Sequence, residues 1–284
     1  MPSSARHPVR RRRRFALLAQ LVAVAVAVGA AVTVVAEGRG GQPGGERLAA
    51  EEVGTPAPLV AGPLPPSADP SPVDVVSPSP SAVLRVPGPV PSAGTGRFGY
   101  DARSGPVLGR AGEVRRYRVA VESGSAEDAA EFADAVQVAL AGPGSWVDSG
   151  RLRLQQVPGA APRDFTVYLA TARTAGRMCA QGGVDIRING RPYTSCRAPG
   201  KVIINLDRWR LSVPHFVSAG VPLAVYRTYV VNHEVGHQLG HRHERCPGAG
   251  RAAPVMMQQT LFLNGCRANP WPYLNGRRHA GPAL

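Results

Sequence analysis

The sequence predicts an α+β fold for one folded domain over residues 97–284. Two observations favour this class: strand-like and helix-like segments share the region, and a long proline-free segment precedes a C-terminal part rich in glycine and proline. The region holds 188 residues, which is enough to bury the core of one domain. We therefore expect a mixed sheet, one long helix and an irregular C-terminal part.

The first two expected elements are a strand and a helix. Residues 113–122 (EVRRYRVAVE) alternate apolar and polar side chains, which indicates a strand. Ser125 begins the sequence S-A-E-D, and a serine followed by acidic residues is typical of a helix N-terminus. An amphipathic helix is expected behind this cap, over residues 129–140.

Three further strands and the long helix are expected downstream. Residues 151–157, 165–170 and 201–206 each resemble a strand, and a turn with glycine and proline precedes the last of them. Pro222 stands where a helix can begin, because the first helical turn does not need its missing N–H. Residues 223–239 then continue without proline and with one internal glycine, so they are predicted to be the longest helix.

The N-terminal residues predict delivery to the membrane. Residues 1–14 form a basic segment that ends in five consecutive arginines, and residues 15–36 carry no charge. As a helix the apolar segment would reach roughly 33 Å, enough to cross a bilayer. Arginines before it keep the N-terminus in the cytoplasm, so we expect a single-pass cell-membrane anchor with an extracellular C-terminal domain. The competing interpretation is a signal peptide cleaved after Ala36, which would make the protein secreted.

A spacer is expected between the apolar segment and the domain. Residues 37–96 are rich in proline, glycine and serine, with 12 prolines between Pro56 and Pro91. Such a composition supplies too few large apolar side chains to offset the entropy of ordering, so it predicts an extended, disordered linker. The alternative is a specific function for this segment, in which a partner protein recognises its proline motifs.

One motif carries chemistry, the sequence HEVGHQLGHRH that begins at His233. His233 and His237 are four residues apart, so on a helix both project from one face and can reach one metal ion. Zinc binds imidazole nitrogen well, and a catalytic zinc site keeps three protein ligands and a water. Glu234 stands beside the first histidine, where it can act on that water.

Gly240 offers a way to bring in a third ligand. A glycine can adopt the left-handed conformation that ends the helix, which lets His243 approach the same ion from outside it. His241 competes for this place by spacing, but His243 is favoured because Gly240 then forms the turn. Three histidines without a thiolate argue against a closed structural zinc site.

The full pattern HExxHxxGxxH resembles the metzincin superfamily of zinc endopeptidases, with matches at His233, Glu234, His237, Gly240 and His243. The chain also resembles a family of exported proteins of high-GC Gram-positive bacteria with a domain of unknown function grouped with zinc peptidases. The resemblance implies a metzincin-like domain, one catalytic zinc ion, protein or peptide as substrate and the glutamate as general base.

Metzincins also carry a methionine turn beneath the metal, and residues 254–257 (PVMM) match it. The valine before Met256 makes this methionine the closer match, with Met257 as the alternative. Some metzincins place a tyrosine two residues further on, but Gln258 stands there in this chain, so the oxyanion-stabilising group stays unassigned. Residues 201–206 are the candidate for the edge strand that aligns substrate.

The four cysteines all lie in the expected domain, at Cys179, Cys196, Cys246 and Cys266. An even number of cysteines outside the cytoplasm predicts two disulfides, for which three connectivities are possible. We favour sequential pairing, because the second bridge would then close the loop that contains the methionine turn. Zinc ligation by cysteine is the rival interpretation, and no C-x-x-C spacing supports it.

The net charge of the domain indicates which kind of surface it would bind. Residues 97–284 hold 24 Lys and Arg against 13 Asp and Glu, a net charge of +11, which favours anionic surfaces such as cell-wall polymers. No nucleic-acid motif is present, so nucleic acid is not an expected partner.

The sequence predicts a membrane-anchored extracellular zinc endopeptidase. The alternative is a catalytically weak, zinc-containing surface protein that binds wall polymer or a partner protein. A zinc amidase that acts on peptidoglycan stem peptides would share the same metal site.

Overall fold

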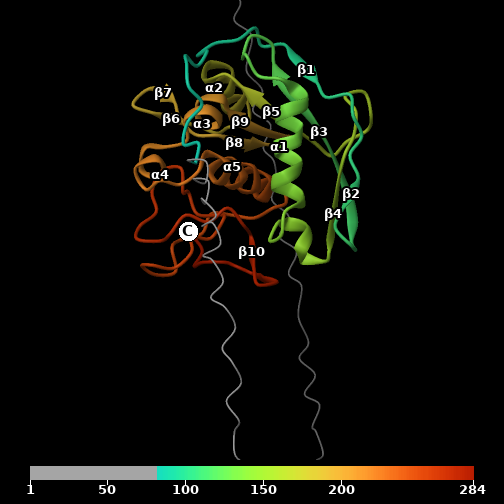
Figure 1. Cartoon of the computed structure of the whole chain (residues 1–284). Coiled ribbons are helices and arrows are strands. Elements are labelled where there is room, and N and C mark those ends of the chain that lie inside the picture. Colours follow the sequence, from blue (N-terminus) through green and yellow to red (C-terminus); the bar gives the residue numbers. More distant parts are fainter. Residues whose placement is uncertain (1–81) are drawn as a thin grey trace, which may run out of the picture. The chain divides into compact units, whose positions relative to one another are not determined.

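The computed structural model of the chain describes residues 82–284. A seven-stranded mixed sheet organises this part of the chain (Figure 1). Its strands are β1 (Phe98–Tyr100), β2 (Val107–Leu108), β3 (Glu113–Glu122), β4 (Leu152–Gln156), β5 (Phe165–Ala170), β8 (Cys196–Ala198) and β9 (Lys201–Asn205). The strand order is β2-β4-β3-β5-β9-β8, and β1 pairs with β3 beside this path.

The middle of the sheet is parallel and its margins are antiparallel. Strands β3, β4, β5 and β9 pair in parallel, with Tyr117 opposite Phe165 and Val167 opposite Val202. Strands β1, β2 and β8 pair with their neighbours in the antiparallel sense. Parallel strands are normally covered on both faces, which agrees with the nearly continuous apolar sequence of β5.

Helices cover both faces of the sheet. They are α1 (Ala129–Ala141), η1 (Trp146–Ser149), α2 (Ala172–Gln181), α3 (Leu206–Leu211), α4 (Pro214–Ser218) and α5 (Leu223–Gln238). Successive side chains of β9 point to opposite faces of the sheet. Val202 and Ile204 pack in the main core with α1 and α5, whereas Ile203 packs in a smaller core with α2. Two hairpins complete the structure, β6 (Arg187–Ile188) with β7 (Arg191–Pro192) and β10 (Tyr273–Leu274) with β11 (Arg277–Arg278).

Local sequence patterns predicted several elements well. Strands β3 and β5 span the expected residues, and α5 begins behind Pro222 as the longest helix. The helix cap expected at Ser125 is wrong, because Asp128 caps α1 and its carboxylate accepts hydrogen bonds from the N–H groups of Ala130 and Glu131.

The strand expected to lie at the edge of the sheet lies inside it. β9 runs between β5 and β8, and β8 is the edge strand on that side. The chain reverses at Gly200, which has a φ of +69°. The three residues of β8 therefore fold back and pair with β9 on the side where an edge was expected. The strand itself ends at Asn205, whose side chain caps α3.

The end of the expected linker packs on the domain. The carbonyl of Val83 accepts a hydrogen bond from the N–H of Leu223, and that of Ser92 accepts one from the N–H of Arg173. A proline-rich segment lacks many N–H donors but keeps every carbonyl acceptor, so it can still join a folded surface. Residues upstream of the expected boundary at Arg97 therefore pack on the domain.

The other N-terminal predictions lie outside the described residues. These are the basic segment 1–14, the membrane anchor or signal sequence 15–36, and the linker up to residue 81. Among the helices of residues 82–284, none has the length and apolar character needed to cross a membrane.

Both expected disulfides are present. Cys179 on α2 bonds to Cys196 on β8, which fixes the helix to the edge strand. Cys246 bonds to Cys266 and closes the loop that contains Met256. The rival interpretation of cysteine as a metal ligand is thereby excluded, since the described chain has no free cysteine.

A buried carboxylate joins the N-terminal segment to the sheet and to α2. Glu122 accepts hydrogen bonds from the N–H of Gly96, the N–H and hydroxyl of Thr171 and the hydroxyl of Thr174, at 2.6–2.8 Å. Burial alone would raise the pKa of the Glu122 carboxyl, but these donors stabilise the charged form and lower the pKa on balance.

Glu122→Gln should therefore destabilise the fold by about 1–3 kcal/mol near pH 7, because an amide cannot accept all of these hydrogen bonds. The folded-state pKa lies below the ordinary value, so the stabilisation is present above about pH 4.3 and is lost as the pH falls through the folded pKa. Urea unfolding from pH 7 to pH 3 would measure this. A difference between variant and wild type that stays constant with pH would contradict the assignment.

Candidate metal centre

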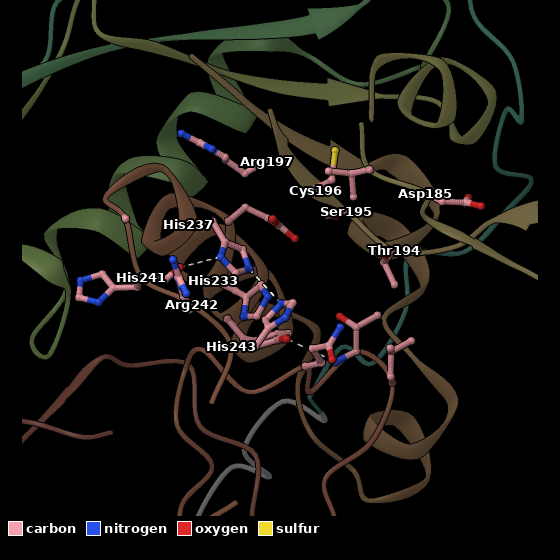
Figure 2. Close-up of a pocket in the computed structure, with 17 residues that line it drawn as sticks. Asp185, Thr194, Ser195, Cys196, Arg197, His233, His237, His241, Arg242 and His243 are labelled. Carbon is pink, nitrogen blue, oxygen red and sulfur yellow. Dashed lines mark hydrogen bonds between the residues drawn. The ribbon is translucent and has the colours of Figure 1, made fainter. Parts of the chain in front are cut away.

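The end of α5 and the turn behind it bring three histidines together. His233 and His237 lie one helical turn apart on α5, which ends at Gln238. Gly240 then adopts a φ of +95°, as a left-handed turn requires, and the chain returns with His243. One ligand atom from each histidine lies within 4.8 Å of the others, a grouping that could hold a metal ion (Figure 2).

Backbone carbonyls orient two of these rings. The Nδ1 atom of His233 donates to the carbonyl of Val255, and Nδ1 of His237 donates to the carbonyl of His241, both at 2.8 Å. Each bond leaves Nε2 free to face the centre, where the Nε2 atoms of His237 and His243 lie 3.0 Å apart. Ligating histidines typically have their second nitrogen fixed in this way.

The environment keeps the three imidazoles neutral. Burial lowers the pKa of His233 to about 3, with the neighbouring His237 adding to the effect. Burial also lowers the pKa of His243 to about 4 and lowers that of His237. A neutral imidazole presents a nitrogen lone pair, so the donor set fits a metal cation.

Glu234 lies beside the histidines, and it lines one cavity together with His233, His237 and His243. Its side chain is largely buried, and burial raises the pKa of its carboxyl to about 8. The cavity has a volume of about 470 Å³. The residues around β8 that line it are Val184, Asp185, Thr194, Ser195, Cys196 and Arg197. No sequence pattern predicted that these residues would line the same cavity as the motif, because the fold of the chain around β8 brings them there.

Met256 packs against α5, the helix that carries His233 and His237. It is fully buried, and a Cβ atom added to Gly236 would overlap its sulfur and lie 2.6 Å from the Trp146 ring. The alternative, Met257, packs in a separate small cluster with Ala253 and Cys266. Met256 is thus the methionine whose side chain packs against the helix.

The competing histidine faces elsewhere. The ring of His241 stacks on Trp146 with centroids 4.3 Å apart, and Figure 2 shows it pointing away from the three grouped histidines. Only its backbone carbonyl serves the group, through His237. The structure therefore places His243, and not His241, in the third position.

The C-terminal residues hold the third histidine in place. The N–H of Leu284 donates to the carbonyl of His243, and the next residue, Glu244, pairs with Arg278 at 2.8 Å. Glu244 also accepts from the N–H of Gly281. This support could not be foreseen from the sequence, because no local pattern links residues that are about 40 positions apart.

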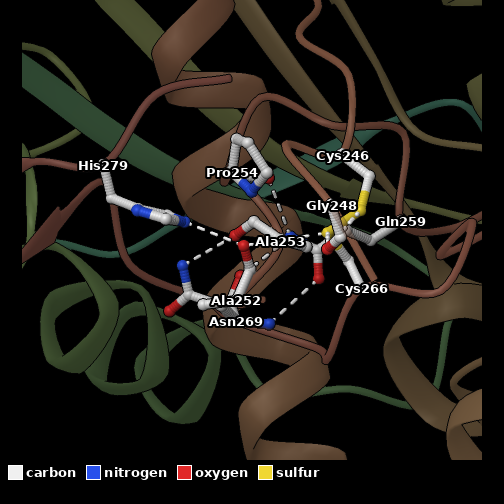
Figure 3. The surroundings of a disulfide bond; sticks show 9 residues. All are labelled: Cys246, Gly248, Ala252, Ala253, Pro254, Gln259, Cys266, Asn269 and His279. Atoms are coloured by element: carbon white, nitrogen blue, oxygen red, sulfur yellow. Dashed lines mark hydrogen bonds between the residues drawn. A yellow bond between two sulfur atoms is a disulfide. The ribbon is translucent and has the colours of Figure 1, made fainter. Parts of the chain in front are cut away.

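Side chains order the irregular region around the second disulfide. Asn269 donates to the carbonyl of Ala253, and His279 bonds the carbonyl of Ala252, both at 2.8 Å (Figure 3). Gln259 bonds the carbonyls of Pro254 and Asn269. These bonds replace the regular ladder that this region lacks.

Residues 85–274 match the model of a family described as "Protein of unknown function (DUF3152)". No curated protein and no solved structure matches the chain.

Gly236→Ala should destabilise the protein by roughly 1–3 kcal/mol and weaken metal binding, because the added methyl group displaces Met256 or Trp146. Gly99→Ala is a matched control, since a Cβ there meets no atom within 4 Å. Thermal unfolding with and without metal would measure both effects. Equal stability of the two variants would show that the contact beneath the helix is not tight.

Substitution of the two competing histidines separates their roles. His243→Gln should lower zinc affinity by more than about 100-fold, since even residues that only orient a ligand contribute 10- to 100-fold. His241→Gln should leave zinc affinity within a few fold, because its ring only stacks on Trp146. Competition titration with a chromophoric chelator would measure both affinities, and a larger loss for His241→Gln would overturn the assignment.

Proposed function

The chain belongs to this family of unknown function, and we propose from the site itself that it is a zinc-dependent endopeptidase acting outside the cytoplasm. The observation that carries the proposal is the group of three neutral histidines with a buried glutamate at one open cavity. Substrates would be proteins or peptides that enter this cavity.

The donor set supports zinc as the ion. Three imidazole nitrogens without a thiolate match catalytic zinc sites, which leave a fourth position for water or substrate. When bound, zinc would supply a Lewis acid for the scissile carbonyl and a water of lowered pKa. The carbonyls of Val255 and His241 hold the rings for this purpose.

Glu234 is assigned as the general base. It follows the first histidine on α5 and lines the cavity, so its carboxylate can accept a proton from the attacking water. Once it has accepted that proton, the same carboxyl can deliver it to the leaving amine nitrogen. Burial raises the pKa of the carboxyl, which helps it to hold the proton between the two steps.

The edge strand β8 supports binding of an extended peptide. One side of β8 pairs with β9, and β8 is the last strand of the sheet on its other side. Ser195, Cys196 and Arg197 also line the cavity of the metal centre (Figure 2). A peptide that adds to this edge would therefore pass the three histidines. β8 thus takes the aligning role that was expected of residues 201–206.

The second candidate is a catalytically weak, zinc-containing surface protein that binds a wall polymer or a protein partner. The observation that favours it is Gln258, which lines the cavity where some metzincins place a tyrosine. A glutamine amide is a weaker acid than a phenol, so it would donate less strongly to a developing oxyanion.

Export is part of the same proposal. Two disulfides indicate an oxidising compartment. Residues 15–36 would anchor the protein in the cell membrane with its domain outside, or direct secretion if cleavage follows Ala36. Either route would bring the metal centre to extracellular peptides.

Glu234→Gln should retain zinc and lower peptide hydrolysis by about 10²- to 10⁴-fold, because it removes the general base but no metal ligand. Zinc content by mass spectrometry and cleavage of a quenched-fluorescent peptide library would test this. A chelator control should abolish cleavage by the wild type. Undiminished cleavage by the zinc-loaded variant would contradict the mechanism.

A further inference from the structure

A second cavity lies beside the metal centre, between α2 and the β6–β7 hairpin. It has a volume of about 990 Å³, and the arginines that line it are Arg173, Arg177, Arg187 and Arg191. We call it the arginine groove. Asp185 and Asp207 are the acidic residues in its lining.

The arginine groove carries uncompensated positive charge. Arg187 is neutralised by a two-point pair with Asp185, with both N–O distances at 2.9 Å. Arg177 donates to the hydroxyl of Thr174 at 2.9 Å. Arg173 and Arg191 are exposed, and neither has a carboxylate within 4.0 Å among residues 82–284. These two guanidinium groups are therefore available to an anionic ligand.

Two contacts fix the width of the groove and its position. A Cβ atom on Gly176 would lie 2.8 Å from the Pro192 ring, so the hairpin packs directly against α2. The disulfide from Cys179 to Cys196 ties α2 to the edge strand at the metal centre. The groove is thus built on the same rigid frame as the three histidines.

The two cavities are neighbours that share a wall. Val184 and Asp185 line both of them, so an extended chain that leaves the metal cavity across these residues would reach the arginine groove. Each residue of an extended chain advances about 3.3 Å, so a few residues on one side of the cleaved bond would lie there. A peptide aligned by β8 is the occupant that this adjacency favours.

Guanidinium groups bind carboxylates through paired N–H donors. The presence of arginine instead of lysine in the groove is not evidence for a carboxylate site, because Lys201 is the only lysine in the chain. What matters is the concave arrangement of unpaired charges beside the cleft. We propose that the arginine groove binds acidic side chains of the peptide substrate, with Arg173 and Arg191 as the specificity-determining contacts; this rests on the proposed endopeptidase function.

Binding of uncleaved peptides by the full-length Glu234→Gln protein loaded with zinc tests the proposal. The probes are fluorescent peptides of about ten residues that carry Asp and Glu on either flank, together with Asn and Gln analogues of the same length. Fluorescence anisotropy would give their dissociation constants at low and high salt.

An acidic flank on one side should tighten binding by roughly 3- to 30-fold at low salt, the sum of two exposed ion pairs. Arg173→Gln/Arg191→Gln should remove most of this preference. Arg110→Gln/Arg251→Gln changes the net charge equally at exposed arginines outside the groove and should retain it. Thermal unfolding would verify that both pairs of substitutions fold.

Equal binding of acidic and neutral peptides, or an equal loss in both double variants, would overturn the proposal. Tighter binding of inorganic polyphosphate of matched charge would also overturn it, by assigning the groove to a phosphate polymer. If the acidic preference depends on Arg173 and Arg191 but the wild type cleaves no peptide, the groove stands as a peptide site and only the endopeptidase proposal fails. If the wild type instead cleaves acidic and neutral peptides equally well, the endopeptidase proposal stands and the proposal for the groove fails.

Discussion

The hydrogen bond from the His233 imidazole to the carbonyl of Val255 connects the two parts of the domain that form the candidate metal centre. His233 lies on α5, which packs in the main core, whereas Val255 belongs to the irregular C-terminal region. The bond fixes the ring and the loop at once, because a buried imidazole and a buried carbonyl each need a partner. The position of the His233 ring therefore depends on the position of the loop that holds Val255.

That loop is stabilised from several directions. Tyr229 on α5 donates to the carbonyl of Met257, and Tyr226 bonds the hydroxyl of Thr260. Burial raises the pKa of both phenols, so they stay protonated as neutral hydrogen-bonding groups. The disulfide from Cys246 to Cys266 then limits how far the loop can move. Without such contacts, a segment this rich in glycine and proline would not keep Met256 against the helix.

Local patterns predicted the parts of the fold that depend on neighbouring residues. The alternation in β3, the apolar residues of β5 and the spacing of the histidines on α5 can each be recognised within one short segment of the sequence. Competition between nearby candidates was harder to judge. Ser125 and Asp128 are both good helix caps, and only the bend of the chain before α1 decides between them.

Long-range pairing limited the prediction of the site. The edge strand β8 has three residues, too few to show a period, and it exists because the chain reverses at Gly200. The arginine groove is equally invisible in the sequence, since Arg173 and Arg191 become neighbours only when the hairpin packs on α2. Function that depends on such surfaces follows from tertiary structure, whereas the histidine motif can be recognised from local spacing alone.

The positive excess of the domain is unevenly distributed over its surface. Several acids of residues 97–284 already serve the fold: Glu122 holds the N-terminal segment, Asp128 caps α1, and Glu244 supports the third histidine. The arginines in ion pairs within the described chain are Arg103, Arg115, Arg187, Arg210 and Arg278. The remaining positive charge is largely unopposed, and where it lines a concave surface it raises the local concentration of anions. The arginine groove is one such surface, and its exposed arginines Arg173 and Arg191 place part of the positive excess beside the candidate metal centre.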